Sequence, residues 1–172
     1  YTRPSKNYVD ASVANGFLAR YYLLSQQWEK AAAAANKARA GYTIMESNAS
    51  GLYDGFVTVN NVEWMWGFAH TTETQTAYAS FFSMISNLAP GYAGIGYAPR
   101  LIDAKLYSQI PEDDGRKKWF NGPEGDASQP TTGAQLPYAN IKFGHLSDWT
   151  ENYMYMRAAE MVLIEAEAYA HL

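Results

Sequence analysis

Three consecutive acidic residues, Glu112, Asp113 and Asp114, are the strongest candidates for catalytic side chains in this chain. A glycosidase uses two carboxyl groups, one on each side of the sugar bond that it cleaves. Adjacent residues in one acidic turn rarely reach that geometry. We therefore favour a structural turn, in which Asp114 precedes a glycine and pairs with Arg116.

The other potentially reactive side chains lack the spacing of a catalytic or metal site. His70, His145 and His171 lie far apart, which disfavours zinc binding. The sequence has no cysteine, which excludes disulfides, a thiol nucleophile and a cysteine zinc site. It also contains no nucleophile elbow, phosphate loop or dinucleotide-binding motif. These observations predict neither an enzyme nor a bound cofactor or metal.

The charge of the chain argues against nucleic acid as a partner. Its formal net charge is −4, and lysines and arginines form no cluster. A protein that binds nucleic acid generally presents a basic stripe to the phosphate backbone.

Aromatic side chains favour a binding function instead. They make up 15% of the 172 residues, including fourteen tyrosines and five tryptophans. The apolar C–H face of a sugar ring packs well on an aromatic ring, while its hydroxyls need polar partners. Aromatics on amphipathic helices usually belong to the core, so we look for ligand contacts on loops. This rule assigns four aromatics to the core: Phe17, Tyr21, Phe81 and Phe82.

Four residues pass this test as candidate ligand contacts. Tyr92 and Tyr97 lie in a glycine-rich loop between two prolines, and Trp66 and His70 lie where a predicted strand gives way to a threonine-rich segment. The loop tyrosines could instead anchor the loop to the body of the protein. We assign Trp64 to the core, whereas Trp66 remains open between core and ligand contact.

The elements that position these residues are helical at both ends of the chain. Asp10 is a good N-cap for a helix with apolar residues at helical spacing, and a second helix runs from Trp28 to Gly41. Residues 10–41 therefore predict a helical hairpin that resembles one tetratricopeptide (TPR) unit. Such a unit needs neighbouring units to bury its faces.

Residues 42–151 form a different, loop-rich region. We expect a strand over 56–68, helices over 77–88 and 101–108, a loop over 90–99, a disordered loop over 121–137 and a short strand over 141–143. Within the helix over 77–88, Tyr78 and Phe81 should point inward.

The last helix is predicted to run from residue 152 to residue 172. It contains the motif Arg157-x-Ala159-Glu160-x-x-Leu163-Ile164-x-Ala166-Glu167-Ala168. Charges beside a tightly packed helix are costly unless they are paired, so we expect ion pairs there. The stripe predicted to pack contains five residues: Ala159, Val162, Leu163, Ala166 and Ala170.

Four landmarks in order carry a family resemblance. They are the hairpin with Trp28-Glu29-Lys30-Ala31-Ala32, the segment Asn60-Asn61-Val62-Glu63-Trp64-Met65-Trp66, the turn Asp114-Gly115-Arg116, and the terminal motif. Together they resemble the SusD/RagB family of bacterial outer-membrane nutrient-binding lipoproteins. The resemblance covers essentially all 172 residues, which match the middle of a longer protein, and so we expect a fragment.

The resemblance implies both a fold and a function. The fold would be mainly α, with TPR-like helix pairs, an irregular insert and one or two short strands. Residues 10–41 would be one helical hairpin, 42–151 the ligand-binding insert and 152–172 the first helix of a further unit of one SusD-like domain. The function would be capture of a glycan, such as a starch-like oligosaccharide, and its delivery to a TonB-dependent, SusC-like transporter. Localisation would be the outer-membrane surface.

Some features depart from the family or leave alternatives. The family's lipid-bearing cysteine is not in this sequence, so the membrane would be reached only through an anchor outside it. Some members carry calcium, for which Asp54 and Glu73 are weak candidates. The alternative function is that of a helical-repeat adaptor that binds a peptide or protein, with the aromatics in its core.

Overall fold

A computed structural model describes residues 2–46, 54–75 and 77–172. The chain forms two compact units, which we describe separately. Unit 1 consists of Tyr1–Met45, Val59–Ala69 and Tyr153–Leu172, and unit 2 consists of Glu46–Thr58 and His70–Asn152. The described elements confirm the predicted fold class, which is mainly α with two short strands and extensive loops.

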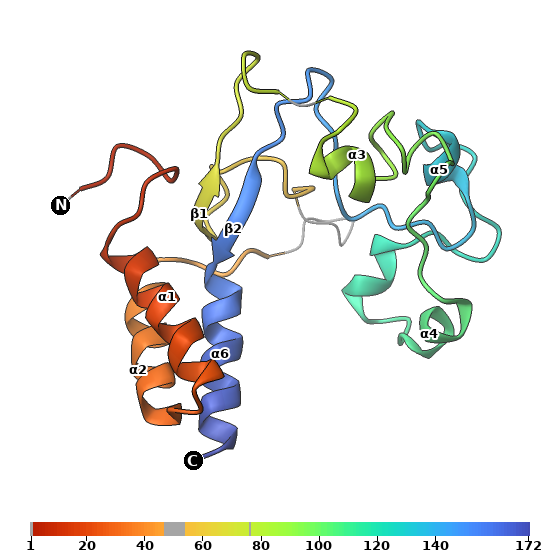
Figure 1. The fold of residues 1–172 in the computed structure, drawn as a ribbon. Helices are drawn as coiled ribbons and strands as arrows, with labels where there is room; N and C mark the ends of the chain where they lie inside the picture. Colours follow the sequence, from red (N-terminus) through yellow and green to blue (C-terminus); the bar gives the residue numbers. More distant parts are fainter. Residues whose placement is uncertain (1, 47–53, 76) are drawn as a thin grey trace. The chain divides into compact units, whose positions relative to one another are not determined.

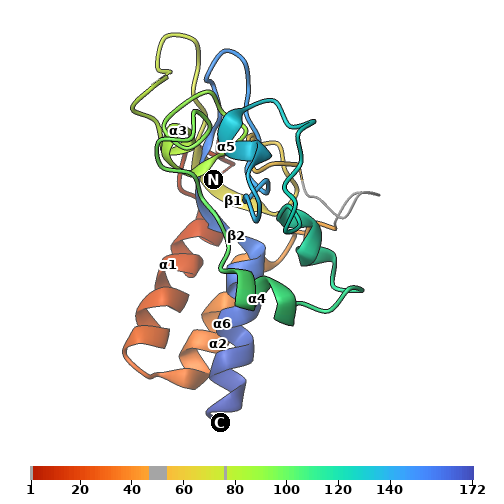
Figure 2. The same ribbon diagram turned by 90° about the vertical axis from the view of Figure 1, so that its right-hand side faces the viewer.

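Unit 1 is built on three helices that lie side by side in both views (Figures 1 and 2). They are α1 (Ala11–Leu24), α2 (Trp28–Arg39) and α6 (Ala158–Ala170). The predicted hairpin is confirmed: the Asp10 carboxylate caps α1 by accepting from the Val13 N–H at 2.9 Å, and Gly41 follows α2 with a positive φ of 87°.

The core of unit 1 is made of small and flexible side chains. Alanines of α2 and α6 are buried against Met65, Met156 and Met161, and α2 alone contributes five buried alanines. Small residues let helix backbones approach closely, and methionine fills the irregular gaps that remain. At Gly16 of α1, an added Cβ would overlap the Met156 sulfur. A side chain at this position would have to displace the flexible end of Met156.

The last helix begins later than the sequence predicted. Residues 153–157 form β2 (Tyr153–Arg157), which pairs antiparallel with β1 (Trp64–Phe68), and α6 starts only at Ala158. Tyrosine and methionine alternate along β2, a period of two that suits a strand. The helix prediction missed this pattern because strand pairing depends on a partner about ninety residues away in the chain.

The packing face of α6 also differs from the prediction. The buried residues are Ala158, Met161, Ile164, Glu165 and Ala168. Leu163, Ala166 and Ala170, which belong to the predicted stripe, are exposed. Because α6 is apolar almost all round, its sequence offers two possible packing stripes, and the positions of α1 and α2 decide between them.

Ion pairs hold the charged residues of α6, as expected, although with partners that the sequence did not indicate. Glu160 pairs with Arg20 of α1 at 2.6 Å, and Glu165 pairs with Arg39 of α2 at 2.7 Å. The Arg157 guanidinium lies 3.5 Å from the buried Glu63 carboxylate. Glu63 and Arg157 belong to two of the landmarks that carried the family resemblance. Glu167 is exposed.

Several aromatics assigned to the core are exposed within their own units. Phe17 and Tyr21 lie on an open face of α1, and Tyr78 and Phe81 are also exposed. Phe82 and Trp64 are buried, as predicted. An amphipathic pattern identifies an apolar face but does not reveal whether another element covers it.

Unit 2 contains little regular structure. Its short elements are α3 (Phe81–Ile85), α4 (Ala104–Gln109), a 3-10 helix, η1 (Gly115–Trp119), and α5 (Thr132–Gln135), separated by loops (Figure 2). The predicted helices over 77–88 and 101–108 exist, although both are shorter. Two isolated antiparallel bridges join Leu101 to Ala139 and Phe120 to Asn140.

Three predictions for the middle of the chain are wrong in detail. The strand expected over 56–68 is limited to Trp64–Phe68, and residues 141–143 form no strand. The segment 121–137, expected to be disordered, contains α5 and is held by the buried Asn121 amide, which donates to the Ala134 and Leu136 carbonyls at 2.6 and 2.9 Å. The Asn121 side chain thus pairs with backbone carbonyls that a helix or a sheet would otherwise satisfy.

Candidate functional site

Three tyrosine rings gather on one part of unit 2. Tyr92 lies between the other two: its ring centroid is 4.9 Å from that of Tyr78 and 6.1 Å from that of Tyr97. The Tyr78 ring stands at 73° to the Tyr92 ring, and the Tyr97 ring is tilted by 55°. We call these three residues the tyrosine cluster.

The rings of the tyrosine cluster are open to solvent. Tyr97 is 80% exposed, Tyr78 48% and Tyr92 37%. An aromatic ring that anchors a loop to a protein body is normally buried, because burial is what stabilises the anchor. Tyr97 therefore does not act as an anchor, whereas Tyr92 is partly covered and contacts both of its neighbours.

The loop that carries Tyr92 is fixed to α3 by hydrogen bonds. The Tyr92 N–H donates to the Ser83 hydroxyl at 3.1 Å, and the Ala93 N–H donates to the Ser83 carbonyl at 2.9 Å. The Ala98 N–H in turn donates to the Tyr92 carbonyl at 3.0 Å, which closes the loop beside Tyr97. Ser83 itself is fully buried.

Glycines allow this loop to pack against its surroundings. A Cβ at Gly91 would overlap the Ser83 hydroxyl, and one at Gly94 would overlap the Ala89 carbonyl oxygen. The Gly133 N–H donates to the Gly94 carbonyl at 2.6 Å, which ties α5 to the loop. The predicted loop over 90–99 is therefore confirmed, and its backbone is held in one conformation by close contacts.

The base of the loop is closed by Asn87, whose side chain is fully buried. Its amide donates to the Arg100 carbonyl at 2.7 Å and to the Asn140 carbonyl at 3.0 Å, and its oxygen accepts from the Arg100 N–H at 2.9 Å. These bonds join the two ends of the segment 87–100. The tyrosine cluster thus stands on a preorganised support.

The other two predicted contact residues have different surroundings. Trp66 belongs to unit 1, where its ring packs edge-on against Phe17 at 5.4 Å and Tyr155 at 4.9 Å. His70 belongs to unit 2, and its Nδ1 lies 2.8 Å from the Thr74 carbonyl oxygen within the threonine-rich turn. For both residues, a role in ligand binding stays a prediction.

Sequence reasoning missed Tyr78 because it placed this residue inside a helix. The helix in fact begins after Ser80, whose hydroxyl accepts from the Ser83 N–H at 3.0 Å as an N-cap. Ser80 was a usable signal, since serine at an N-cap position places the residues before it outside the helix. Tyr78 then falls on a loop, where the rule for aromatic contacts would have selected it.

The acidic turn is structural, as favoured from the sequence. The Arg116 guanidinium and N–H donate to the Asp114 carboxylate at 2.5 to 3.1 Å, and these hydrogen bonds lower the pKa of Asp114 to about 2. Glu112 accepts from the Lys117 ammonium at 2.5 Å. Two of the three carboxylates in the turn, those of Glu112 and Asp114, are thus held by neighbouring cations, which favours a structural turn over the two opposed carboxyl groups of a glycosidase.

Neither a metal-binding cluster nor a membrane-spanning helix is found in the described part of the chain. Residues 2–46, 54–75 and 77–172 contain no group of three or more histidine or acidic side chains placed to hold a metal ion. The Asp54 carboxylate accepts from the Phe56 N–H at 3.0 Å. Over the same ranges, no helix combines the length and the apolar character needed to span a bilayer.

Fold and site together define a class: a scaffold of packed helices that carries an irregular unit with exposed aromatics. The structure is similar to a SusD-like carbohydrate-binding protein from Bacteroides vulgatus, with a TM-score of 0.73 and 28% sequence identity over 99% of this chain and 35% of that one. It is also similar to a SusD superfamily protein from Bacteroides thetaiotaomicron, with a TM-score of 0.67 and 18% identity over 96% of this chain and 38% of that one.

A third similar structure is a SusD-like protein from Bacteroides fragilis, with a TM-score of 0.62 and 16% identity over 99% of this chain and 45% of that one. No protein-family model and no curated protein matches the chain. These structural similarities confirm the resemblance to SusD-like proteins noted in the sequence. The chain spans less than half the length of these solved structures.

Proposed function

We propose that this protein binds glycans without chemically altering them, and that the tyrosine cluster of unit 2 is a contact surface for sugar rings. The observation that carries the proposal is an exposed ring, Tyr97, beside a half-covered ring, Tyr92, on a hydrogen-bonded loop. Stacking a sugar on these rings removes apolar surface from water on both partners. A rigid loop lowers the entropy cost of binding.

The similarity to a SusD-like carbohydrate-binding protein supports the same ligand class. On that basis we propose that the whole protein is a lipoprotein of the outer-membrane surface, which captures an oligosaccharide and passes it to a TonB-dependent, SusC-like transporter. Neither a metal nor a nucleotide is needed for capture of this kind. Thr132, which is exposed beside Gly96, is a polar group available to sugar hydroxyls near Tyr97.

The alternative function, a helical-repeat adaptor for a peptide or protein, has one observation in its favour. Phe17, Leu18, Tyr21 and Leu24 of α1 form an exposed apolar row in unit 1. Rows of this kind often mark protein contact surfaces. Substitution of this row would weaken protein binding under the alternative and leave glycan binding unchanged under the main proposal.

Affinity gel electrophoresis with starch and a panel of other soluble polysaccharides tests the proposal. The Tyr97→Ala and Tyr92→Ala variants should each bind the retained polysaccharide about tenfold more weakly, because each loses roughly one stacked ring. Tyr21→Ala is the matched control, since Tyr21 is an exposed tyrosine of unit 1. If both cluster variants migrate like the parent protein, or if Trp66→Ala alone abolishes retention, the tyrosine cluster is not the site.

A further inference from the structure

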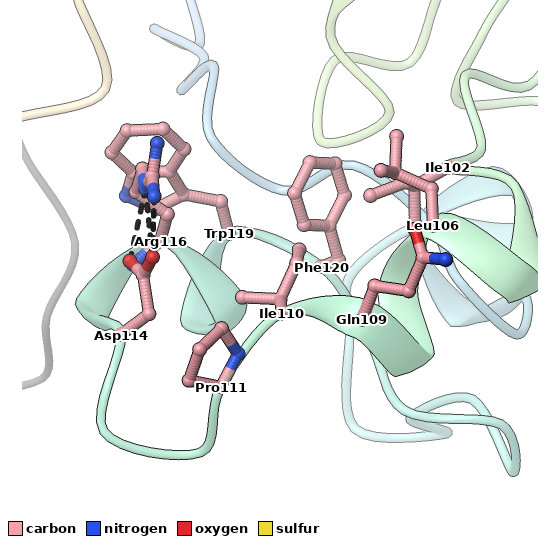
Figure 3. Close-up of a pocket in the computed structure, with 9 residues that line it drawn as sticks. All are labelled: Ile102, Leu106, Gln109, Ile110, Pro111, Asp114, Arg116, Trp119 and Phe120. Atoms are coloured by element: carbon pink, nitrogen blue, oxygen red, sulfur yellow. Dashed lines mark hydrogen bonds and ion pairs between the residues drawn. The ribbon is translucent and has the colours of Figure 1, made fainter.

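A hollow of unit 2 lies beside α4 and η1 (Figure 3). Its volume is about 340 Å³. Volumes of this order are at the lower end of those typical of small-molecule sites. The tyrosine cluster contributes none of its lining residues. What could occupy it therefore depends on the chemistry of its own walls.

The floor of the hollow is apolar. Ile110 and Phe120 line it, together with Leu106 of α4 (Figure 3). Trp119 adds an indole ring, which is held in place by the Lys142 ammonium at 4.3 Å from the ring centroid. A flat ligand with one apolar face would cover aromatic and aliphatic carbon here.

The two ends of the hollow are polar. The Asp114–Arg116 ion pair lies at one end and the Gln109 amide at the other, with the apolar floor between them (Figure 3). Carboxylate, guanidinium and amide groups are all good hydrogen-bond partners for hydroxyl groups. The arrangement is therefore amphipathic in the same sense as a pyranose ring, which has C–H faces and a rim of hydroxyls.

We propose that this hollow is a second glycan-binding subsite, which holds one pyranose ring on Phe120 and Trp119 with its hydroxyls toward Asp114–Arg116 and Gln109. The inference shares its ligand class with the proposed function but uses separate residues. A glycan that reached both places would bind more tightly than at either one, because the second contact becomes intramolecular.

The ion pair favours a sugar over an apolar peptide side chain as the occupant. An aliphatic side chain that filled the hollow would strip water from Asp114 and Arg116 and offer no hydrogen bond in return, which is costly for charged groups. Sugar hydroxyls replace the lost water on both groups. The Gln109 amide at the other end of the hollow also favours a sugar, because an aliphatic side chain would offer it no hydrogen bond.

Titration of the protein with the methyl glycosides of glucose, galactose, mannose and xylose, followed by NMR of the five tryptophan indole N–H signals, tests the proposal. Trp119→Phe assigns the Trp119 signal by its loss. We expect that signal to shift with at least one glycoside, with a dissociation constant on the order of millimolar for so small a ligand. Gln109→Ala should weaken the response about three- to tenfold.

A matched pair of variants on α4 controls for folding and charge. Leu106→Arg places a long side chain across the hollow and should abolish the shift, whereas Ser108→Arg adds the same charge on the same helix outside the hollow and should leave it intact. The proposal is overturned if no glycoside moves the Trp119 signal, or if Gln109→Ala and Leu106→Arg both respond like the parent. It is also overturned if N-acetyl-leucine amide moves the signal and the glycosides do not.

The test separates this subsite from the tyrosine cluster. In the Tyr97→Ala variant the Trp119 response should persist, because the two sets of residues do not overlap. A Trp119 response to a glycoside, together with polysaccharide retention that Tyr92→Ala and Tyr97→Ala leave unchanged, would refute the tyrosine cluster as a contact surface and leave the subsite standing. The reverse result would refute the subsite alone.

Discussion

Two glutamates of unit 1 form ion pairs with arginines. The burial of each carboxylate determines how much its ion pair contributes to the stability of the fold. The Glu165 side chain is only 9% exposed and pairs with Arg39, whereas Glu160 and Arg20 are each about one third exposed. Loss of a partner leaves a buried carboxylate without compensation, whereas a more exposed one is screened by water.

We therefore expect Arg39→Met to lower the free energy of unfolding by about 1–3 kcal/mol, and Arg20→Met by about 1 kcal/mol or less. Urea denaturation followed by circular dichroism measures both. The double variant Arg39→Met with Glu165→Met should recover most of the loss, because neither charge then remains buried. Equal losses at Arg39 and Arg20 would contradict this assignment.

The Asp114–Arg116 turn gives a prediction in pH. Hydrogen bonds from Arg116 lower the pKa of Asp114 from 3.8 to about 2, so the carboxylate stabilises the fold above its ordinary pKa and this contribution is lost as the pH falls through about 2. In Arg116→Ala the pKa of Asp114 should return toward 3.8 in an NMR titration of the side-chain carboxyl carbon. An unchanged pKa would show that Arg116 is not its cause.

At the scale of single residues, the sequence predicted the interactions between residues that are close together in the chain. Asp114 with Arg116 is a local pair, and its two-residue separation was enough to identify it. The sequence drew attention to Glu167 and not to Glu165. Packing against α1 and α2 determines which side of α6 is buried, and the sequence of α6 alone does not show it. Tyr97 was selected correctly as a loop residue, and its exposure agrees with that choice.

At the scale of elements, the loop of residues 90–99 depends on glycine for its close packing. A Cβ at Gly94 would meet the backbone of Ala89 and Asn87, which cannot move without breaking the loop base. Gly115, the first residue of η1, has open space around its Cβ position and no positive φ, so it is a suitable control elsewhere in unit 2.

Gly94→Ala should lower the free energy of unfolding by about 2–4 kcal/mol, in the range of backbone clashes, and should weaken retention by polysaccharide in the affinity gel. Gly115→Ala should change stability by no more than about 0.5–1 kcal/mol, with retention unaffected. Thermal unfolding and the gel assay provide the two readouts. Similar behaviour of the two variants would mean that the loop adapts and is not preorganised.

Elements were predictable where their signals are local. The N-cap at Asp10 and the C-terminal glycine at Gly41 bracketed the hairpin correctly. Strand β2 was read as helix because its only support is pairing with β1, which is distant in the sequence. Segment 121–137 was read as disordered because its bonds come from Asn121, whose partners cannot be deduced from composition.

At the scale of the whole molecule, two compact units use different means of stabilisation. Unit 1 buries alanines and methionines between helices, whereas unit 2 relies on buried amide side chains that bond to backbone groups. Asn87 makes three such bonds across the segment that carries the tyrosine cluster. Its removal would take these bonds from the Arg100 N–H and from the Arg100 and Asn140 carbonyls.

Asn87→Ala should lower the free energy of unfolding by about 2–4 kcal/mol, because the three hydrogen bonds that join the ends of the segment 87–100 are lost. Asn15→Ala on the exposed side of α1 is the control and should change stability by less than about 0.5 kcal/mol. Hydrogen exchange should show the loss of protection for Asn87→Ala in unit 2. A global loss in the control, or none in Asn87→Ala, would contradict this account.

The sequence predicted the resemblance to SusD-like proteins and the mainly α fold, and three of its four landmarks lie in unit 1. Glu63 and Arg157, far apart in the chain, lie together in unit 1. The sequence could not assemble the tyrosine cluster, because the distance between Tyr78 and Tyr92 is set by the bonds of Ser83 and by the start of α3.

The most direct test of the central claim is to map ligand contacts on the tyrosine rings. Selective isotope labelling of tyrosine, with Tyr78, Tyr92 and Tyr97 assigned by substitution, allows their ring signals to be followed while the polysaccharide fragment that binds in the gel assay is added. The account predicts shifts at Tyr97 and Tyr92 and none at Tyr21. Shifts at Tyr21 with unchanged rings in the tyrosine cluster would contradict it.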